Sequence, residues 1–207
     1  MATTLQPPPP TKFPSSGSRR RLKPREPGGP STGIWVGLAA ITMTFAAFTS
    51  AMVVRQGSAN DWRHFAFPLI LYVNTLVLVA SSLTLQMARR RFAVLASGVE
   101  QNVQPAFRAL YGTLFLGCLF VAGQSAAWLQ LRSEGIYLAS APSSSFFYVF
   151  TVLHALHVVG GVFGLAYVIS KLHRGALRLG TLSAASLYWH FMGLLWLYLL
   201  VVLRFRI

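Results

Sequence analysis

The sequence has very few acidic residues. Only four of its 207 residues are Asp or Glu, namely Glu26, Asp61, Glu100 and Glu134, and all four lie outside the long apolar runs. An apolar segment therefore offers no carboxylate pair for acid–base catalysis or for binding a transported ion. Charged residues make up 11% of the chain, against about 25% in an average soluble domain. A chain of this composition is poorly suited to be surrounded by water.

Cysteine is almost absent as well. Cys118 is the only cysteine and lies inside an apolar run, so the chain has neither an intrachain disulfide nor a thiolate metal site. The sequence also lacks a phosphate-binding glycine loop, a nucleophile paired with a base, and an internal repeat. It therefore predicts no catalytic residues, and the missing repeat weighs against an inverted-repeat transporter.

Apolar residues are abundant, at 54% of the chain, and they gather in five runs. The runs cover about residues 34–54, 67–88, 107–130, 146–170 and 184–203. Each has the roughly 20 residues that a helix needs to cross a bilayer. The sequence predicts an all-α membrane protein with five transmembrane helices, forming one bundle over residues 33–207. Pro68, Pro105 and Pro142 stand where the second, third and fourth helices should begin, a position that tolerates proline.

Residues 1–32 have a different composition. This segment holds eight of the eleven prolines and the basic residues Arg19, Arg20, Arg21 and Lys23. It has too little apolar surface to repay the entropy of ordering, so we expect a disordered cytoplasmic tail. A transit peptide is the alternative, although the prolines would interrupt the amphipathic helix that it requires.

The formal charge of +14 is distributed as in membrane proteins. Basic residues lie in the tail and at the ends of apolar runs, which favours a membrane topology over nucleic-acid binding. If successive links between the apolar runs lie on alternate sides of the membrane, one side has thirteen Lys and Arg residues and the other has five. The positive-inside rule then predicts a cytoplasmic N-terminus and an outside C-terminus. We also expect anionic lipid headgroups to contact Arg89, Arg90, Arg91, Lys171 and Arg174.

Polar and small residues inside the apolar runs define the candidate sites. In residues 147–168, His154, His157, Gly161 and Gly164 occupy one helical face, which indicates close packing against another helix. Comparable faces on the other helices carry Asn74, Ser81, Ser82, Gln124, Trp128, Ser186, Trp189 and His190. Because imidazole is a common ligand, a b-type haem on His154, His157 or His190 is the alternative, with His154 and His190 as the pair to test. Packing is favoured, because no carboxylate or thiolate could complete a metal site.

Several segments together resemble the haem-copper oxidase subunit III family. They are Phe67-Pro68, Asn74-Thr75-Leu76, Ser81 to Thr84, Gly117 to Gln124 with Trp128, His154-Ala155-Leu156-His157-Val158, and Tyr188-Trp189-His190-Phe191. The resemblance covers residues 34–207, in order and spacing, and is closest to the short five-helix bacterial form of cytochrome c oxidase subunit III.

The resemblance implies an accessory subunit in a bacterial cytoplasmic (inner) membrane. Such a subunit binds no cofactor, because haem and copper lie in subunits I and II of the complex, which reduces oxygen and translocates protons. It packs on subunit I, with subunit II and small subunits nearby, and holds phospholipid in a cleft between helices. A subunit III-like partner of a quinol oxidase or nitric oxide reductase is the related alternative.

Three positions depart from the family. Where its members usually carry carboxylates, this sequence has Ile41, Ala127 and Gly193. These departures weigh against a role in handling protons, and they leave the structural and lipid-binding roles of the family intact.

Overall fold

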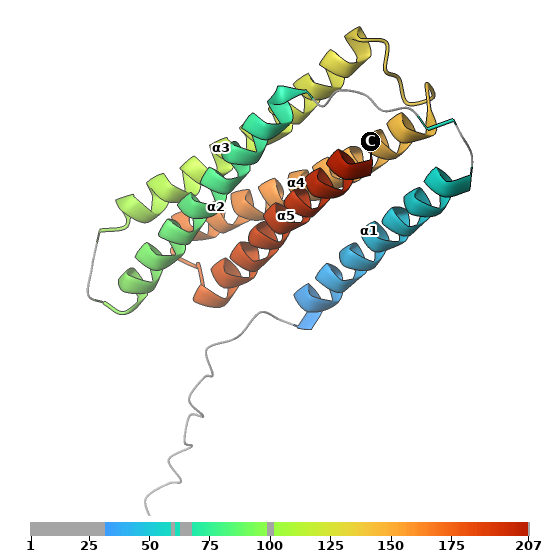
Figure 1. The fold of residues 1–207 in the computed structure, drawn as a ribbon. Coiled ribbons are helices and arrows are strands. Elements are labelled where there is room, and N and C mark those ends of the chain that lie inside the picture. Colours follow the sequence, from blue (N-terminus) through green and yellow to red (C-terminus); the bar gives the residue numbers. More distant parts are fainter. Residues whose placement is uncertain (1–31, 59–60, 63–67, 99–101, 207) are drawn as a thin grey trace, which may run out of the picture.

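Five α-helices make up the regular structure of the described residues. The computed structural model describes residues 32–58, 61–62, 68–98 and 102–206. The helices are α1 (Thr32–Ser58), α2 (Leu69–Ala96), α3 (Gln104–Ser133), α4 (Pro142–His173) and α5 (Leu179–Arg206) (Figure 1). All five are long and apolar enough to cross a membrane, which confirms the predicted fold class. The predicted tail, except for Thr32 at the start of α1, lies outside the described residues.

All five helices end beyond the predicted apolar runs, and four also begin before them, whereas α2 begins at Leu69, two residues later than predicted. They contain 27 to 32 residues, which corresponds to lengths of about 40–48 Å. A bilayer core is about 30 Å thick, so the helix ends reach into the headgroup layers. Pro68 directly precedes α2, Pro105 lies in the first turn of α3, and Pro142 begins α4. These are positions where the missing N–H leaves no helical hydrogen bond broken.

Four helices form a compact group, and α1 lies to one side of it. Among the described residues α2 packs on α3 and α5, α4 packs on α3 and α5, and α1 contacts only α4 and α5 (Figure 1). The core between them contains large aromatic side chains that are almost completely buried: Phe45, Phe120, Phe147, Phe150, Trp189 and Trp196. Because these rings are large, the helices can approach one another only where the facing residues are small, as on the polar and small-residue faces predicted from the sequence.

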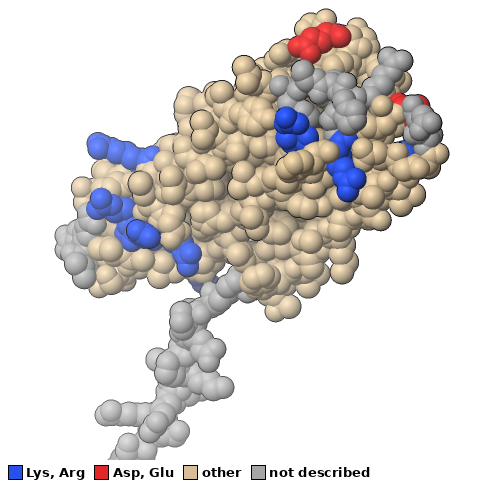
Figure 2. Space-filling view, viewed as in Figure 1, with Lys and Arg blue, Asp and Glu red and all other residues tan. Residues whose placement is uncertain are grey.

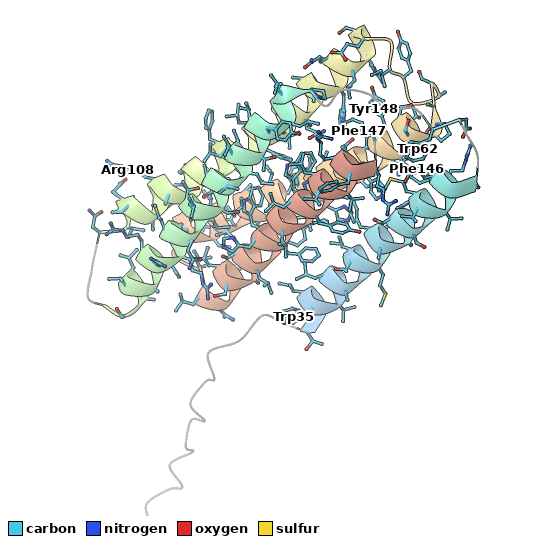
Figure 3. All side chains as sticks on the ribbon, viewed as in Figure 1. Trp35, Trp62, Arg108, Phe146, Phe147 and Tyr148 are labelled. Atoms are coloured by element: carbon cyan, nitrogen blue, oxygen red, sulfur yellow. The ribbon has the colours of Figure 1, made fainter. Side chains whose placement is uncertain are left out.

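Contacts near the ends of α1 and α5 hold α1 in place. The Trp62 indole N–H donates to the Arg206 carbonyl oxygen at 2.7 Å, and the Trp62 ring lies 6.2 Å from that of Phe146 at the start of α4 (Figure 3). Arg55 donates two hydrogen bonds to Asp61, of 3.0 and 2.6 Å. The hydrogen bond from Arg55 holds the pKa of the Asp61 carboxyl below its usual value. Together these contacts join the end of α1 to α4 and α5.

Charged side chains mark the two ends of the bundle. One end carries Arg89, Arg90, Arg91, Arg108, Lys171, Arg174 and Arg178. Asp61 and Glu134 lie at the opposite end, together with a smaller group of arginines. Figure 2 shows basic atoms at the end of the bundle where α2 ends and α3 begins, and acidic atoms at the far end. This asymmetry is the one that the positive-inside argument used, and the orientation itself stays a prediction.

Candidate functional site

Trp189 of α5 is the point where four helices meet. Its indole is buried and donates a 2.6 Å hydrogen bond to the Ser81 hydroxyl of α2. A Cβ atom on Gly117 of α3 would come within 2.7 Å of the indole, and one on Gly161 of α4 within 3.0 Å. Glycine at both positions therefore makes room for the ring between α3 and α4. The polar faces predicted on α2 and α4 meet at this tryptophan.

A second set of polar contacts lies further toward the acidic end. The Asn74 amide of α2 donates to the Phe120 carbonyl of α3 at 2.9 Å, and a Cβ on Gly123 would overlap the Asn74 side chain. Two more indoles, those of Trp196 and Trp128, donate to the hydroxyls of Thr75 and Thr151 at 3.0 and 3.1 Å. Buried indole N–H groups need such acceptors, which links α2 to α5 and α3 to α4.

The three membrane histidines have three different surroundings. His154 is completely buried, with its ring 5.8 Å from that of Phe120 and 5.1 Å from that of Trp196. The ring of His157 is half-buried beside Phe45 of α1, at 5.9 Å, with Nδ1 lying 2.7 Å from the oxygen of Leu153. His190 is half-buried on α5 and lines a groove toward α2.

This arrangement bears on the haem alternative. His154 lies beside Trp196, which is six residues, or about 9 Å, along α5 from His190. His154 therefore lies among the core rings, whereas His190 lines the groove toward α2. In the part of the chain that the structure describes, no three His, Cys, Asp or Glu side chains gather as a metal site would require.

Gly164 makes no close helix contact among the described residues, so the packing predicted there stays a prediction. Gly164 is exposed, and a Cβ there would meet no described atom within 4 Å. At 100° per residue, Gly164 lies about 80° around the helix from His154. It therefore falls at the edge of the helical face that carries His154. His157, about 60° from His154, is accordingly only half-buried.

The three positions at which the resemblance predicts a missing carboxylate differ in burial. Ala127 is completely buried in the core, and Ile41 is half-buried against it. Gly193 lines the groove between α2 and α5. A carboxylate at Ala127 would face the apolar interior of this bundle.

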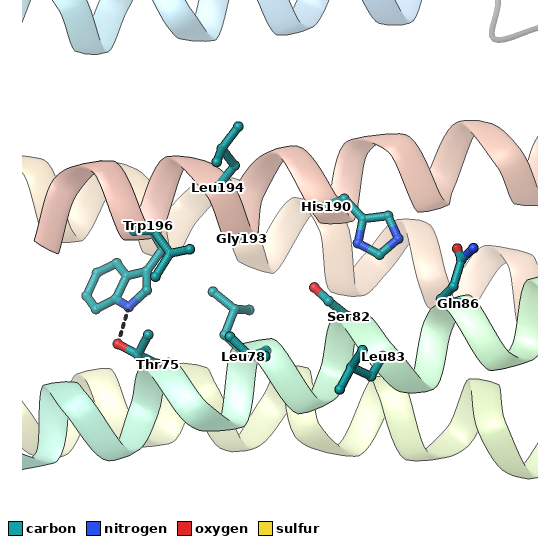
Figure 4. A pocket seen from close by; sticks show the side chains of 11 residues that line it. Thr75, Leu78, Ser82, Leu83, Gln86, His190, Gly193, Leu194 and Trp196 are labelled. Atoms are coloured by element: carbon teal, nitrogen blue, oxygen red, sulfur yellow. Dashed lines mark hydrogen bonds between the residues drawn. The ribbon is translucent and has the colours of Figure 1, made fainter. Parts of the chain in front are cut away.

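A groove runs between α2 and α5 on the outer surface of the bundle. In Figure 4 His190 and Gln86 lie toward one end of it, and Trp196 and Thr75 toward the other. Leucine and valine side chains and Ser82 line the space between, and Gly193 leaves it open. Past Gln86, α2 continues into the exposed residues Arg89, Arg90 and Arg91. The α2–α5 groove is therefore apolar along its length and basic at one end.

A second hollow lies between α5 and α1. Its lining includes Phe45 and Ala46 of α1 and Phe191, Leu195 and Tyr198 of α5. Leu194 borders both this hollow and the α2–α5 groove.

The remaining basic residues singled out by sequence lie at the end of α4, where the Lys171 ammonium group is 5.4 Å from the centre of the Tyr167 ring.

Sequence reasoning predicted a lipid cleft but not which helices border it, and it missed the acceptors Thr75 and Thr151. A signal for the acceptors was available, because every tryptophan within an apolar run needs a hydroxyl or carbonyl partner for its indole N–H. No comparable signal exists for the hollows, which depend on how far apart the helices lie.

Comparison with known proteins identifies the family. The sequence model of the family described as "Cytochrome c oxidase subunit III" matches residues 38–206, which takes in nearly all of the five helices. The chain belongs to this family. A relative from Nocardia farcinica, named "Probable cytochrome c oxidase subunit 3", is 31% identical over 182 residues, covering 84% of this chain and 87% of the relative.

Two other relatives extend the range of the family. "Cytochrome c oxidase subunit 3" of Corynebacterium diphtheriae is 30% identical over 184 residues, covering 84% of this chain and 87% of the relative. "Heme-copper oxidase subunit I+III" of Aeropyrum pernix is 29% identical over 174 residues, covering 80% of this chain and 21% of that longer protein. The family is that of an accessory, multi-pass membrane subunit which associates with subunit I of an oxidase complex.

Proposed function

We propose that this chain is a non-catalytic subunit III of a respiratory cytochrome c oxidase in a bacterial cytoplasmic membrane. It binds no haem or copper itself and supports the subunits that reduce oxygen and translocate protons. The observation that carries the proposal is the family match through residues 38–206, which includes every buried seam described above. The use of the buried tryptophans and histidines for packing supports an accessory role.

Purification of the intact complex tests this proposal. The tagged chain, extracted in mild detergent, should bring with it a haem-containing subunit I and an oxygen-consuming activity. Replacing His154 or His190 by alanine should leave the haem content per subunit I unchanged. Recovery of the chain alone, without any haem protein, would contradict the proposal.

The outer face of α1 is the surface that we propose to contact subunit I. Among the described helices it has the smallest buried share, and it contacts only two of them. Small residues are exposed along its length at spacings of three and four: Gly33, Gly37, Ala40, Thr44, Ala47 and Ala51. Such a face lets a neighbouring transmembrane helix approach closely. Replacing Ala47 by phenylalanine should reduce recovery of subunit I, whereas the same change at the exposed Leu129 of α3 should not.

We further propose that the α2–α5 groove holds one acyl chain of an anionic phospholipid. The apolar lining fits a hydrocarbon chain, and Arg89 and Arg90 lie beyond its end, where an anionic headgroup would be held. Each basic residue near the membrane surface contributes about 1 kcal/mol to such binding. We expect Lys171 and Arg174, at the same end of the bundle, to contact further headgroups.

Native mass spectrometry of the complex measures this binding. Changing Arg89 and Arg90 to glutamine should reduce the anionic lipid that stays bound. The same changes at Arg204 and Arg206, at the opposite end of the bundle, serve as the control and should leave it unchanged. Equal lipid retention in all variants would contradict the groove assignment.

A further inference from the structure

Among the described residues, three buried side chains have atoms without hydrogen-bond partners, and two of them, Gln124 and His154, lie on neighbouring helices. Both amide atoms of Gln124 on α3 and both ring nitrogens of His154 on α4 are unpaired among the described residues. Neither side chain has any exposed surface. Buried polar atoms in native proteins are almost always paired, with protein or with ordered water. Four unpaired atoms on two neighbouring helices therefore require an explanation.

The contacts around these side chains place them at the same depth. The Trp128 indole, one turn beyond Gln124, bonds to Thr151, which lies one turn before His154. The Phe120 ring, one turn before Gln124, lies 5.8 Å from the ring of His154. Since α3 and α4 run antiparallel and touch on both sides of Gln124, its side chain and that of His154 approach each other between these contacts.

The chemistry of the two groups is complementary. A neutral imidazole has one donor and one acceptor, and a glutamine amide has two donors and a carbonyl acceptor. The rings of Phe120 and Trp196 enclose His154 and supply no charge to balance a proton on it. No direct hydrogen bond joins the two side chains in the described structure. A buried water typically makes about three hydrogen bonds and can pair such groups.

We propose that Gln124 and His154 bind one water molecule inside the bundle, between α3 and α4. The water accepts from one side chain and donates to the other, which links the two helices at a depth where the bilayer supplies no solvent. The site is independent of the lipid groove and of the contact with subunit I. Both side chains are needed, since removing one leaves the other and the water with too few partners.

Density maps of the intact oxidase complex, at a resolution that shows ordered water, test the site directly. A peak within hydrogen-bond distance of both the Gln124 amide and the His154 ring is the expected result. Direct contact between the two side chains, with no density between them, would overturn the proposal. So would a map in which both side chains bond to other groups.

Thermal unfolding of the purified complex provides the second test. Gln124→Leu and His154→Phe should each lower the melting temperature, and the double variant should lose clearly less than the sum, because the second change removes an already orphaned group. His154→Gln keeps a donor and an acceptor and should retain most of the stability. Strictly additive losses for Gln124→Leu and His154→Phe would overturn the linked site.

Ser186 offers the matched control. Its hydroxyl is also buried and unpaired, but it lies on α5 one turn before Trp189, well away from His154. Ser186→Ala should have little effect on the melting temperature, because it removes an unpaired polar atom. Combined with His154→Phe, it should give an additive change.

Discussion

At the scale of single residues, two glycines in α4 show that a neighbouring aromatic ring determines whether a larger side chain would fit. Gly161 lies against Trp189 and Tyr188, and the nearest ring atoms would be 3.0 to 3.1 Å from an added Cβ. Gly164, one turn later, faces open space in the described structure. Both residues are glycines that the sequence places on one face of α4. Their different surroundings therefore come from their different angles around the helix axis.

The two glycines give a paired prediction. Gly161→Leu should destabilise the bundle by about 1–3 kcal/mol, because the added side chain overlaps the indole of Trp189. Gly164→Leu should change the stability little. The difference is measured by heating complexes that contain either variant and recording the temperature at which subunit III dissociates. Equal stability of the two variants would show that the packing at Gly161 is unimportant.

Asp61 gives a prediction about pH. Its pKa is held below the usual value by the hydrogen bonds from Arg55, so the ion pair stabilises the native state above the unfolded carboxyl's pKa of about 3.9. That stabilisation disappears as the pH falls through the lowered pKa. The melting temperatures of the wild type and Asp61→Asn should therefore differ at pH 7 and converge in acid. A constant difference down to pH 2 would contradict this assignment.

At the scale of elements, the link between α2 and α5 depends on two indole hydrogen bonds. Ser81→Ala should leave the buried N–H of Trp189 without an acceptor, at a cost of about 1–3 kcal/mol. Ser82→Ala is the matched control, because Ser82 lines the α2–α5 groove and accepts no indole. Denaturation of both variants in detergent compares them. A loss at Ser82 as large as that at Ser81 would argue against the bond.

The helices were more predictable than their contacts. Five spans follow from length and apolarity, because a bilayer demands about 20 apolar residues per helix. Helical spacing also indicated which face of each helix carries Asn74, Ser81 and Gln124, all of which are buried. It did not indicate that Ser81 pairs with Trp189, 108 residues away. Such pairings depend on which helices become neighbours, and periodicity within one helix carries no information about that.

At the scale of the whole molecule, the uneven charge of the two ends predicts the orientation. Ser97, directly after α2, and Ser133, the last residue of α3, are both exposed. They lie at opposite ends of the bundle. In a chain with Cys118→Ser, a cysteine replacing Ser133 should react with a membrane-impermeant maleimide added to spheroplasts. A cysteine replacing Ser97 should react only after permeabilisation. The reverse pattern would show that the charge argument gives the wrong orientation.

The position of α1 has a consequence for the order in which the protein is made. This helix is the first of the five to leave the ribosome, yet its described partners are α4 and α5, the last two. Trp62, just after α1, bonds to the backbone of Arg206, the next-to-last residue of the chain. α1 can therefore form these contacts only after α4 and α5 have been synthesised. Loss of only a few residues at the C-terminus would remove part of its attachment, although α1 itself would be unaltered.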